Sequence, residues 1–296
     1  MQNDRQYKEI SCPVCGCETK KVLYPDTLGG GSPKFDYNFS PEHNKTYRIV
    51  RCKDCFHVYI SPLPMNLWEN YISVVDQLYL KNQKTRYMTA EKVIKRIRRF
   101  CPEGRLLDVG CATGDFLHIA QEYYKVEGLE ISRWSAQLAR ERGILIHENL
   151  LDEVKGDCLY DVITLWGVIE HFENPQRDVQ HVFRLLKPNG VVCLWTGDVD
   201  CLLSRALGKK WWHYQGQHVQ MFTEASLSKL FREAGFKKEW MGMYPYVMNI
   251  ESILRSLGRY PIVSKIANKL IGKTGFLNHN VTIMLPGEMF AIFRKC

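Results

Sequence analysis

The sequence predicts an α/β fold, in which a mostly parallel sheet is covered by helices on both faces. From Arg105 onward, apolar strand-like segments alternate with amphipathic helical segments, and the connections between them are short. Continuous apolar strands of this kind are typical of parallel sheets that are buried on both sides. Two Cys-x-x-Cys pairs before residue 62 predict a small separate module in front of this sheet.

The N-terminal module, residues 1–62, contains the sequences CPVCGC and CKDC. Each Cys-x-x-Cys pair can place two thiolates on one metal ion, and two pairs complete a tetrahedral site. We therefore predict a zinc ribbon with a structural Zn²⁺ bound by Cys12, Cys15, Cys52 and Cys55. Cys17 and His57 lie close enough in sequence to replace one of these ligands. A redox-active cysteine pair is the less favoured alternative, because two pairs in one small module favour a metal.

Residues 63–104 are predicted to form a linker and a helix. An irregular stretch rich in aromatic residues follows the S-P-L-P sequence at 61–64 and continues to about residue 79. A helix is predicted over about 84–100, because Ala90, Val93, Ile94 and Ile97 recur at helical spacing and basic residues cover the other face.

Residues 105–296 are predicted to form the α/β domain. Strands are expected at 105–109, 125–129, 144–147, 160–165 and 191–195, and helices at 115–123, 132–142 and 176–186. A further helix begins after the N-cap candidate Thr223 and closes near residue 235. Two late strands are expected at 236–244 and 288–294, with an insertion of basic helices between them at about 245–285.

The segment LLDVGCATGDFL, residues 106–117, reads as a strand, a tight turn and the start of a helix. Small residues at Gly110, Ala112 and Gly114 are expected to let backbone N–H groups face a ligand at the end of the strand. Glu130 ends the next strand, where a carboxylate can accept both hydroxyls of a ribose. A dinucleotide-binding site is the alternative, but the third glycine of its G-x-G-x-x-G fingerprint is absent.

These residues resemble the class I S-adenosylmethionine-dependent methyltransferases over about 106–294. The resemblance rests on DVGCATG, Glu130, YDVITLWGVIEHFENP and RLLKPNGVVCLWT, in that order. It implies a Rossmann-like, seven-stranded and mostly parallel sheet with an antiparallel last strand. It also implies S-adenosylmethionine as the cofactor.

The same resemblance assigns roles to the residues around the turn. The methionine end of the cofactor would be lined from the turn and the adenine from the ends of the second and third strands. Glu130 would bind the ribose and Trp166 would lie beside the sulfonium. The implied cofactor-binding residues are Asp108, Gly110, Cys111, Gly114, Glu130, Ile131, Asn149, Leu150 and Trp166.

Two histidines are candidates for the base that a hydroxyl acceptor requires. His171 follows the fourth strand and His218 lies in a loop after the fifth, near several aromatic residues. The alternative for His171 is a packing role under the cofactor. The N-P-P-Y type tetrad is absent after the fourth strand, which counts against methylation of base exocyclic amines or glutamine.

The cysteine module followed by S-P-x-P and this domain resembles methyltransferases of sugar, polysaccharide and natural-product pathways. This resemblance implies a small-molecule or glycan acceptor, such as a sugar nucleotide or polysaccharide, and leaves O-, C- and N-methylation open. The alternative is an RNA methyltransferase that grips phosphates with the zinc ribbon and the basic helices. A non-catalytic adaptor is disfavoured, because an adaptor does not require a nucleoside site.

The net charge is 40 − 32 = +8, and positive charge gathers in 81–99 and in 255–273. The favoured interpretation of both segments is a solvated helix face, and the alternative is that the second segment contacts an anionic substrate or a membrane surface. The N-terminus is polar and lacks an apolar signal segment, so we expect a cytoplasmic protein. The sequence does not indicate an oligomeric state.

Overall fold

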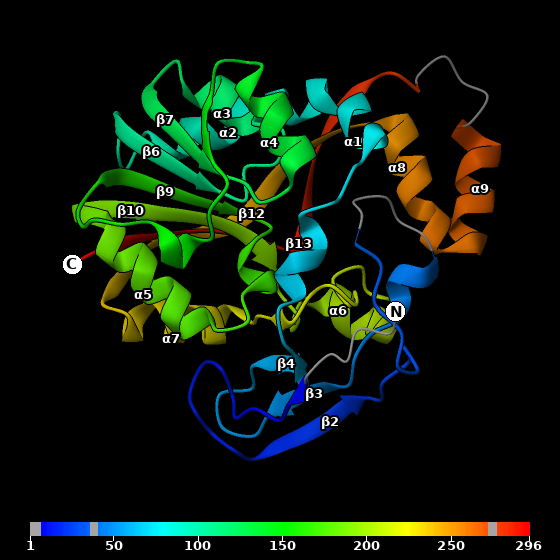
Figure 1. Ribbon diagram of the computed structural model, residues 1–296. Helices are drawn as coiled ribbons and strands as arrows, with labels where there is room; N and C mark the ends of the chain where they lie inside the picture. The colour runs from blue at the N-terminus through cyan, green and yellow to red at the C-terminus, as the bar shows by residue number, and fades with distance from the viewer. Residues whose placement is uncertain (1–6, 36–40, 272–276) are drawn as a thin grey trace.

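The computed structural model describes residues 7–35, 41–271 and 277–296 (Figure 1). Its centre is a seven-stranded sheet in the order β12-β13-β10-β9-β6-β7-β8. Adjacent strands from β10 to β8 pair in parallel, whereas β13 is antiparallel to both of its neighbours. The strands are β6 (Gly104–Val109), β7 (Tyr124–Leu129), β8 (Leu145–His147), β9 (Tyr160–Trp166), β10 (Leu186–Gly197), β12 (Phe236–Asn249) and β13 (Asn280–Lys295). The predicted α/β fold with one antiparallel strand is confirmed.

Helices cover both faces of this sheet (Figure 1). Alternate strand residues enter two hydrophobic cores: Leu106 and Val162 pack with α2, α3 and α4, whereas Leu107 and Ile163 pack with α5 and α7. This alternation follows from the period of two in a strand and gives the sheet two buried faces. The helices are α2 (Gln83–Ile97), α3 (Asp115–Ala120), α4 (Arg133–Arg140), α5 (Pro175–Leu185) and α7 (Glu224–Glu233).

A small antiparallel sheet lies below the larger one in Figure 1, in the order β11-β4-β3-β2. Three of its strands come from the N-terminal segment: β2 (Lys20–Tyr24), β3 (Ile49–Cys52) and β4 (Val58–Ile60). The fourth, β11 (Gln220–Met221), comes from the loop that precedes α7 and pairs with β4. A separate strand pair joins β1 (Tyr7–Lys8) to β5 (Leu63–Pro64). The small sheet is therefore completed by the larger domain.

Short elements connect these layers. Residues 67–81 contain the 3-10 helix η2 (Leu67–Tyr71) and α1 (Gln77–Lys81), and both precede α2. After β10 come α6 (Leu202–Leu207) and the 3-10 helix η5 (Gly208–Lys210). Three more 3-10 turns are η1 (Pro41–Asn44), η3 (Leu151–Glu153) and η4 (Ile169–His171).

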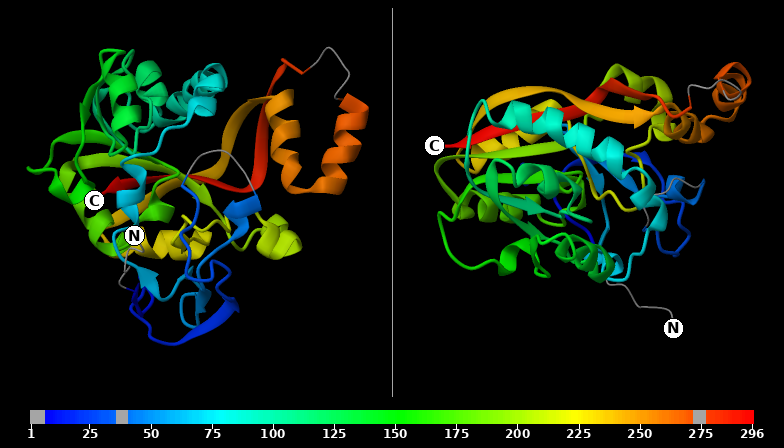
Figure 2. Two further views of the ribbon diagram at one scale, coloured as in Figure 1. Left: turned by 45° about the vertical axis from the view of Figure 1, so that its right-hand side comes forward. Right: turned by 90° about the horizontal axis from the view of Figure 1, so that it is seen from above.

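The insertion between the last two strands is shorter than the predicted 245–285. Strands β12 and β13 continue lengthwise past the end of their neighbour β10 as a two-stranded ribbon, so residues 245–249 and 280–285 are strand. The helical part consists of α8 (Ile250–Ser256), η6 (Leu257–Arg259) and α9 (Pro261–Ile271), which project from the body (Figure 2). Asn249 caps α8 by accepting a hydrogen bond from the Ser252 N–H at 2.7 Å, which fixes where the strand ends.

Other boundaries differ by a few residues. Helix α2 ends at Ile97 rather than at 100, and β10 begins at Leu186, five residues before the predicted start. The K-P-N-G turn thus lies inside β10, where the pairing with β9 shifts register between Leu186 and Val191. Thr223 caps α7 as predicted. Among the described residues, no helix combines the length and the apolar character needed to cross a lipid bilayer.

Candidate functional site

The turn after β6 requires small residues at two positions. Gly110 has a φ of +67° and Gly114 a φ of +75°, in the left-handed region that favours glycine. A Cβ atom on Gly110 would lie 2.8 Å from Val168, and one on Gly114 would lie 2.7 Å from Ile144. The two glycines therefore allow the segment after β9, and Ile144 with the end of α4, to pack closely against the turn.

The backbone amides of this turn are bonded within the protein, contrary to the expectation that they face a ligand. The N–H groups of Gly110 and Cys111 donate to the Leu129 carbonyl at 2.8 and 3.0 Å. Ala112 donates to the Glu130 carboxylate at 2.8 Å, and Gly114 donates to the Cys111 carbonyl. The turn is thus held in shape by the end of β7, and the Cys111 thiol is buried in the core beneath it.

Two buried carboxylates lie at this edge of the sheet. Glu130 accepts from the Ala112 amide and, with its second oxygen, from the Ser132 amide at 2.7 Å. Asp108 accepts from the Thr164 hydroxyl at 2.6 Å. Burial raises the pKa of Asp108 to about 8, and the nearby charge of Glu130 adds to this effect. A positively charged ligand at this edge would favour the ionised form of both carboxylates.

The predicted adenine-binding residues lie around a pocket. A depression of about 230 Å³ is lined by Ile131 and Leu150, together with Trp68 and Ile72 from the segment before α2. Asn149 is exposed between the end of β8 and Leu150. Trp166 lies elsewhere, in an aromatic cluster with Phe116, at 5.1 Å between ring centroids, and with Tyr244 and Phe290.

The segment containing η2 and α1 covers this edge, which the sequence did not indicate. The Ser132 hydroxyl donates to the Val74 carbonyl at 3.0 Å, and the Arg133 amide donates to Ile72 at 3.3 Å. Arg86, from α2, pairs with the buried Asp115 at the start of α3 at 2.5 Å. These contacts tie residues 72–86 to the starts of α3 and α4.

The two predicted histidines lie side by side, with 4.9 Å between their ring centroids. Nδ1 of His171 is 3.0 Å from the Tyr71 hydroxyl and 3.0 Å from the Gln217 carbonyl. Nδ1 of His218 is 2.8 Å from the His213 carbonyl, which can only accept a hydrogen bond. Nδ1 of His218 is therefore the protonated nitrogen, and Nε2 carries the free lone pair.

Burial lowers the pKa of His218 well below its usual value, and the charges of His171 and His213 lower it further. The ring is therefore neutral near pH 7 and able to accept a proton. A third histidine, His213, belongs to the aromatic stretch that the sequence places before His218, and its ring packs against His218 at 5.8 Å between centroids.

Two buried carboxylates support the cluster of His171, His213 and His218, which we call the histidine cluster. Glu288 accepts from the indoles of Trp195 at 2.6 Å and Trp212 at 2.5 Å, and it lies 3.1 Å from Nε2 of His213. Glu170 accepts from the Thr196 hydroxyl at 3.1 Å. Glu288 was not predicted, although one acidic residue just before the apolar run M-F-A-I-F was a usable signal.

Tyr71 connects the histidine cluster to the strand ends that carry Asp108 and Glu130, which we call the carboxylate edge. Its hydroxyl contacts His171, and its pKa is raised by burial and then by the charges of Glu170 and Glu130. Tyr244 forms a second connection, because its ring centroid lies 5.9 Å from that of Trp166 and 5.3 Å from that of Trp195, and Trp195 in turn lies 6.1 Å from His213. The two parts of the candidate site are therefore contiguous.

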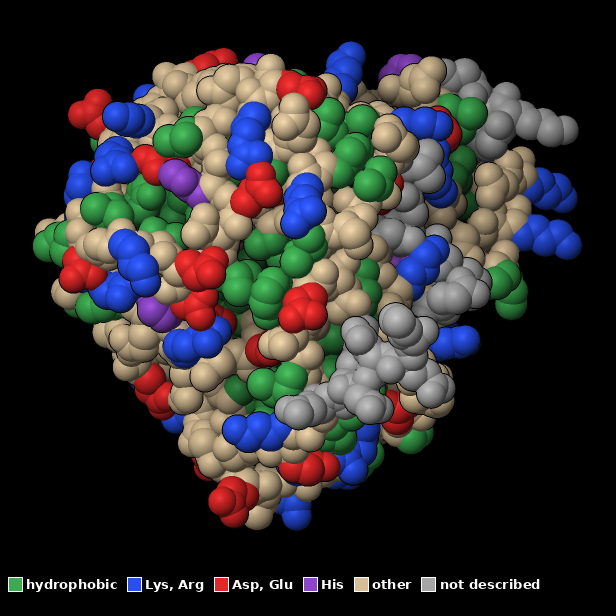
Figure 3. Space-filling model, viewed as in Figure 1, with side chains coloured by type: hydrophobic (Ala, Val, Ile, Leu, Met, Phe, Trp, Pro, Cys, Tyr) green, Lys and Arg blue, Asp and Glu red, His purple; other side chains and the backbone are tan. Residues whose placement is uncertain are grey.

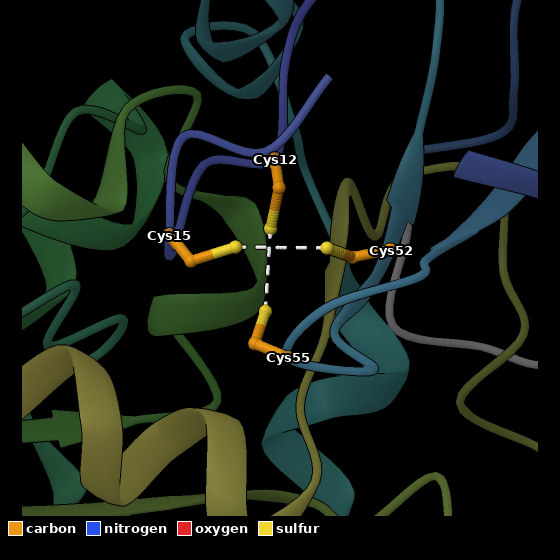
Figure 4. Close-up of side chains that lie close together, drawn as sticks. All are labelled: Cys12, Cys15, Cys52 and Cys55. Atoms are coloured by element: carbon orange, nitrogen blue, oxygen red, sulfur yellow. Dashed lines mark hydrogen bonds between the residues drawn. The ribbon is translucent and has the colours of Figure 1, made fainter. Parts of the chain in front are cut away.

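The four predicted metal ligands converge on one point (Figure 4). The Sγ atoms of Cys12 and Cys55 are 3.5 Å apart, those of Cys15 and Cys52 are 3.6 Å apart, and all four lie within 4.8 Å of one another. Thiolates in a tetrahedral zinc site lie roughly 3.8 Å apart. The four cysteines therefore fit a metal ion of this kind.

The two alternative ligands lie outside this cluster. The His57 ring is buried, and its nitrogens bond the Ser226 hydroxyl at 3.2 Å and the Gln220 side chain at 2.9 Å. Cys17 contacts the Thr19 hydroxyl at 3.1 Å.

Comparison with curated proteins identifies related sequences. Residues 81–239, more than half of the chain, match the family described as a methyltransferase domain. An uncharacterized protein of Methanocaldococcus jannaschii, MJ1123, is 27% identical over 175 residues, which cover 58% of this chain and 82% of that protein. A ubiquinone biosynthesis O-methyltransferase of Rickettsia canadensis is 31% identical over 98 residues, or 31% of this chain. The match spans only 42% of that enzyme's length.

Solved structures share the fold at low sequence identity. A SAM-dependent methyltransferase from Archaeoglobus fulgidus aligns with a TM-score of 0.52 at 17% identity, covering 74% of this chain and 100% of that one. A SAM-dependent methyltransferase from Thermotoga maritima aligns with a TM-score of 0.51 at 19% identity, covering 77% and 97%. The family match, the strand order and the carboxylates at the edge of the sheet agree, and the chain belongs to the methyltransferase domain family as a SAM-dependent methyltransferase.

Proposed function

We propose that the protein transfers the methyl group of S-adenosylmethionine to a hydroxyl group of a small molecule of the sugar or glycan class. The observation that carries this proposal is the chain of contacts between the two parts of the site: the Tyr71 hydroxyl contacts His171, and the carbonyl of the next residue, Ile72, accepts a hydrogen bond from the amide of Arg133, three residues after Glu130. An S-adenosylmethionine molecule bound at the carboxylate edge would present its methyl group toward the histidine cluster. The ubiquinone biosynthesis O-methyltransferases among the relatives support a hydroxyl acceptor.

The cofactor supplies an electrophilic methyl group, and the residues of this chain would bind and orient it. Asp108, from β6, and Glu130, directly after β7, are the anionic groups of the site, and Glu130 would accept from the ribose hydroxyls. The remaining contacts would come from Ile131 and Leu150 around the pocket, with Gly110, Cys111, Gly114, Asn149 and Trp166 completing the set predicted from sequence.

His218 is the proposed general base. Its Nδ1 is held by the His213 carbonyl, so the basic Nε2 is fixed in orientation and is neutral near pH 7. His171 is its proposed partner, because Tyr71 and Gln217 hold that ring beside it. The indoles and tyrosines around the cluster offer flat apolar faces next to hydrogen-bonding groups, which suit a ring that carries several hydroxyls.

The test replaces His218 by alanine. Turnover should fall at least about 100-fold, because a general base contributes a factor of this size or more. Calorimetry should show unchanged affinity for S-adenosylhomocysteine, since the ring lies outside the nucleoside edge. His181→Ala is the matched control, because that histidine lies on α5, away from the cluster.

The acceptor for this assay would come from incubating the protein with labelled S-adenosylmethionine and fractionated cell extract, followed by mass identification of the product. Near-normal turnover of the His218→Ala variant would refute its role as the base. Failure of the wild-type protein to bind S-adenosylhomocysteine would refute the proposed cofactor site.

We also propose that Cys12, Cys15, Cys52 and Cys55 bind a structural Zn²⁺. Four thiolates close the tetrahedral site and leave no open position for a substrate, so the ion would stabilise the small sheet without taking part in the reaction. The sulfur spacing supports this assignment.

A further inference from the structure

Helix α9 is amphipathic, but its apolar side faces away from the protein. Ile262, Val263, Ile266 and Leu270 share one side of the helix, and we call them the α9 face. Ile262 is 78% exposed and Leu270 is 70% exposed. Helices on a protein surface normally bury such a stripe against the core.

The polar side of α9 faces the body instead. Ser264 and Asn268 line a pocket of about 350 Å³ together with Leu254 and Arg255 of α8. The helix therefore presents its aliphatic side chains to the surroundings and its small polar ones to the protein. A contiguous exposed apolar surface of this kind indicates an interaction site.

The charges around the α9 face are almost all positive. Lys265 and Lys269 lie along one side of it, and Lys and Arg side chains project from this edge of the molecule in Figure 3. Glu251 is the one acidic residue between 250 and 271, and it pairs with Arg255 at 2.7 Å. An aliphatic stripe flanked by lysines is complementary to an anionic lipid surface, where lysines contact headgroups and aliphatic side chains enter the acyl boundary.

Neighbouring elements extend this surface. The Tyr260 hydroxyl donates to the Lys210 carbonyl at 3.0 Å, which fixes the start of α9 beside η5. Lys209 and Lys210 belong to η5, and Leu202 of the preceding α6 is 82% exposed.

Two other occupants fit less well. A second copy of this chain, packed on the same face about a two-fold axis, would bring lysines from both copies close together. A nucleic acid would be complementary to the lysines but not to the four exposed aliphatic side chains, which would remain in water.

The start of α9 is connected to the segment that carries the histidine cluster, because the Tyr260 hydroxyl bonds the carbonyl of Lys210, three residues before His213. A bilayer that contacts α9 would thus lie near the residues proposed to activate the acceptor.

We propose that α9 is a membrane-docking helix that lies flat on bilayers containing anionic phospholipid. Its aliphatic face enters the interface, and Lys265 and Lys269 contact the headgroups.

The test is flotation of the full-length protein with vesicles of phosphatidylcholine alone or with about 30% phosphatidylglycerol, where two interfacial lysines should strengthen binding roughly tenfold or more. The Ile266→Asp/Leu270→Asp double variant should lose binding to both kinds of vesicle. The Lys265→Glu/Lys269→Glu double variant should lose the preference for anionic vesicles. Leu145→Asp is the matched control, because Leu145 is 55% exposed on β8, at the opposite edge of the sheet from β12.

Three results would overturn the proposal. The wild-type protein would fail to float with anionic vesicles, or Leu145→Asp would reduce flotation as much as the α9 variants do. Alternatively, sedimentation would show a wild-type dimer that Ile266→Asp/Leu270→Asp converts to a monomer, which would identify a second copy as the occupant. Unchanged S-adenosylhomocysteine binding by the variants shows that they are folded and separates this test from that of the proposed reaction.

Discussion

His218 is unusual in being a buried histidine whose surroundings act against its protonation. Burial has the largest effect, and the charges of two neighbouring histidines lower its pKa further. The proposed base is therefore active at a lower pH than an exposed histidine would be.

This shift predicts the pH dependence of the reaction. A base must be deprotonated to act, so kcat/KM falls as pH drops below the pKa of His218 in the free enzyme. With S-adenosylmethionine saturating, its positive charge favours the ionised form of Asp108, and kcat/KM for the acceptor should then stay level from pH 8 to below pH 6.5, because the pKa of His218 lies below 6.5. An acidic limb centred at or above pH 6.5 would contradict the assignment, provided that circular dichroism shows a folded protein throughout.

The sequence predicted a site residue where a side chain suited to the ligand stands at the end of a strand or within a recognisable motif. Glu130 directly follows the second strand, at the distance from the glycine turn that is typical of a nucleoside site. In the structure its carboxylate accepts a hydrogen bond from Ala112 of that turn. Tyr71 and Glu288 were not predicted, because their partners are distant in sequence and neither belongs to a motif. Tyr71 meets a histidine 100 residues away, and Glu288 lies 75 residues from His213.

The pairing of β4 with β11 joins the cysteine module to the proposed catalytic loop. Strand β11 begins two residues after His218, and its Gln220 and Met221 pair with Tyr59 and Val58. The Val219 amide donates to the Glu170 carbonyl at 2.9 Å, and the Val219 carbonyl accepts from Ile60 at 3.1 Å. The module therefore fixes the position of the chain on one side of the histidine cluster.

Loss of the proposed metal should consequently reduce both stability and turnover. Cys52→Ser removes one ligand at the end of β3, and we expect a lower melting temperature, a lower zinc content and a lower kcat. Affinity for S-adenosylhomocysteine should change little, because the carboxylate edge does not contact β4. Zinc analysis, differential scanning fluorimetry and calorimetry measure these effects.

Cys158→Ser is the control for this experiment, since Cys158 is exposed and far from the cluster in sequence. Full turnover by a metal-free protein would show that β11 keeps its position without the ion.

The alternating strands and helices were predicted from apolar periodicity, but the extent of the last two strands was not. Residues 245–249 and 280–285 extend past the part of β13 that pairs with β10, and there β12 and β13 pair with each other. Val247 is buried on this ribbon, whereas Val281 and Met284 are exposed. Apolar patterns cannot reveal such a ribbon.

At the scale of the whole molecule, the cysteine module and the α/β domain share a hydrophobic core. Val14, Val50 and Tyr59 belong to the same buried cluster as Ile163 of β9 and Phe231 of α7. The strand order could be expected from the resemblance to class I methyltransferases. The position of the module could not, because it depends on contacts between segments far apart in the chain.

This shared core predicts that the two parts unfold together. Calorimetry of the metal-loaded protein should show a single transition, with equal calorimetric and van't Hoff enthalpies. Two separate transitions, with the lower one abolished by a chelator, would show instead that the module unfolds independently.

The segment that covers the carboxylate edge also has a kinetic consequence. Residues 72–86 are bonded to the starts of α3 and α4, across the place proposed for the nucleoside. Exchange of spent cofactor for fresh cofactor would then require these contacts to break in each cycle. Product release would limit the rate, and a burst of methylated product should precede steady-state turnover.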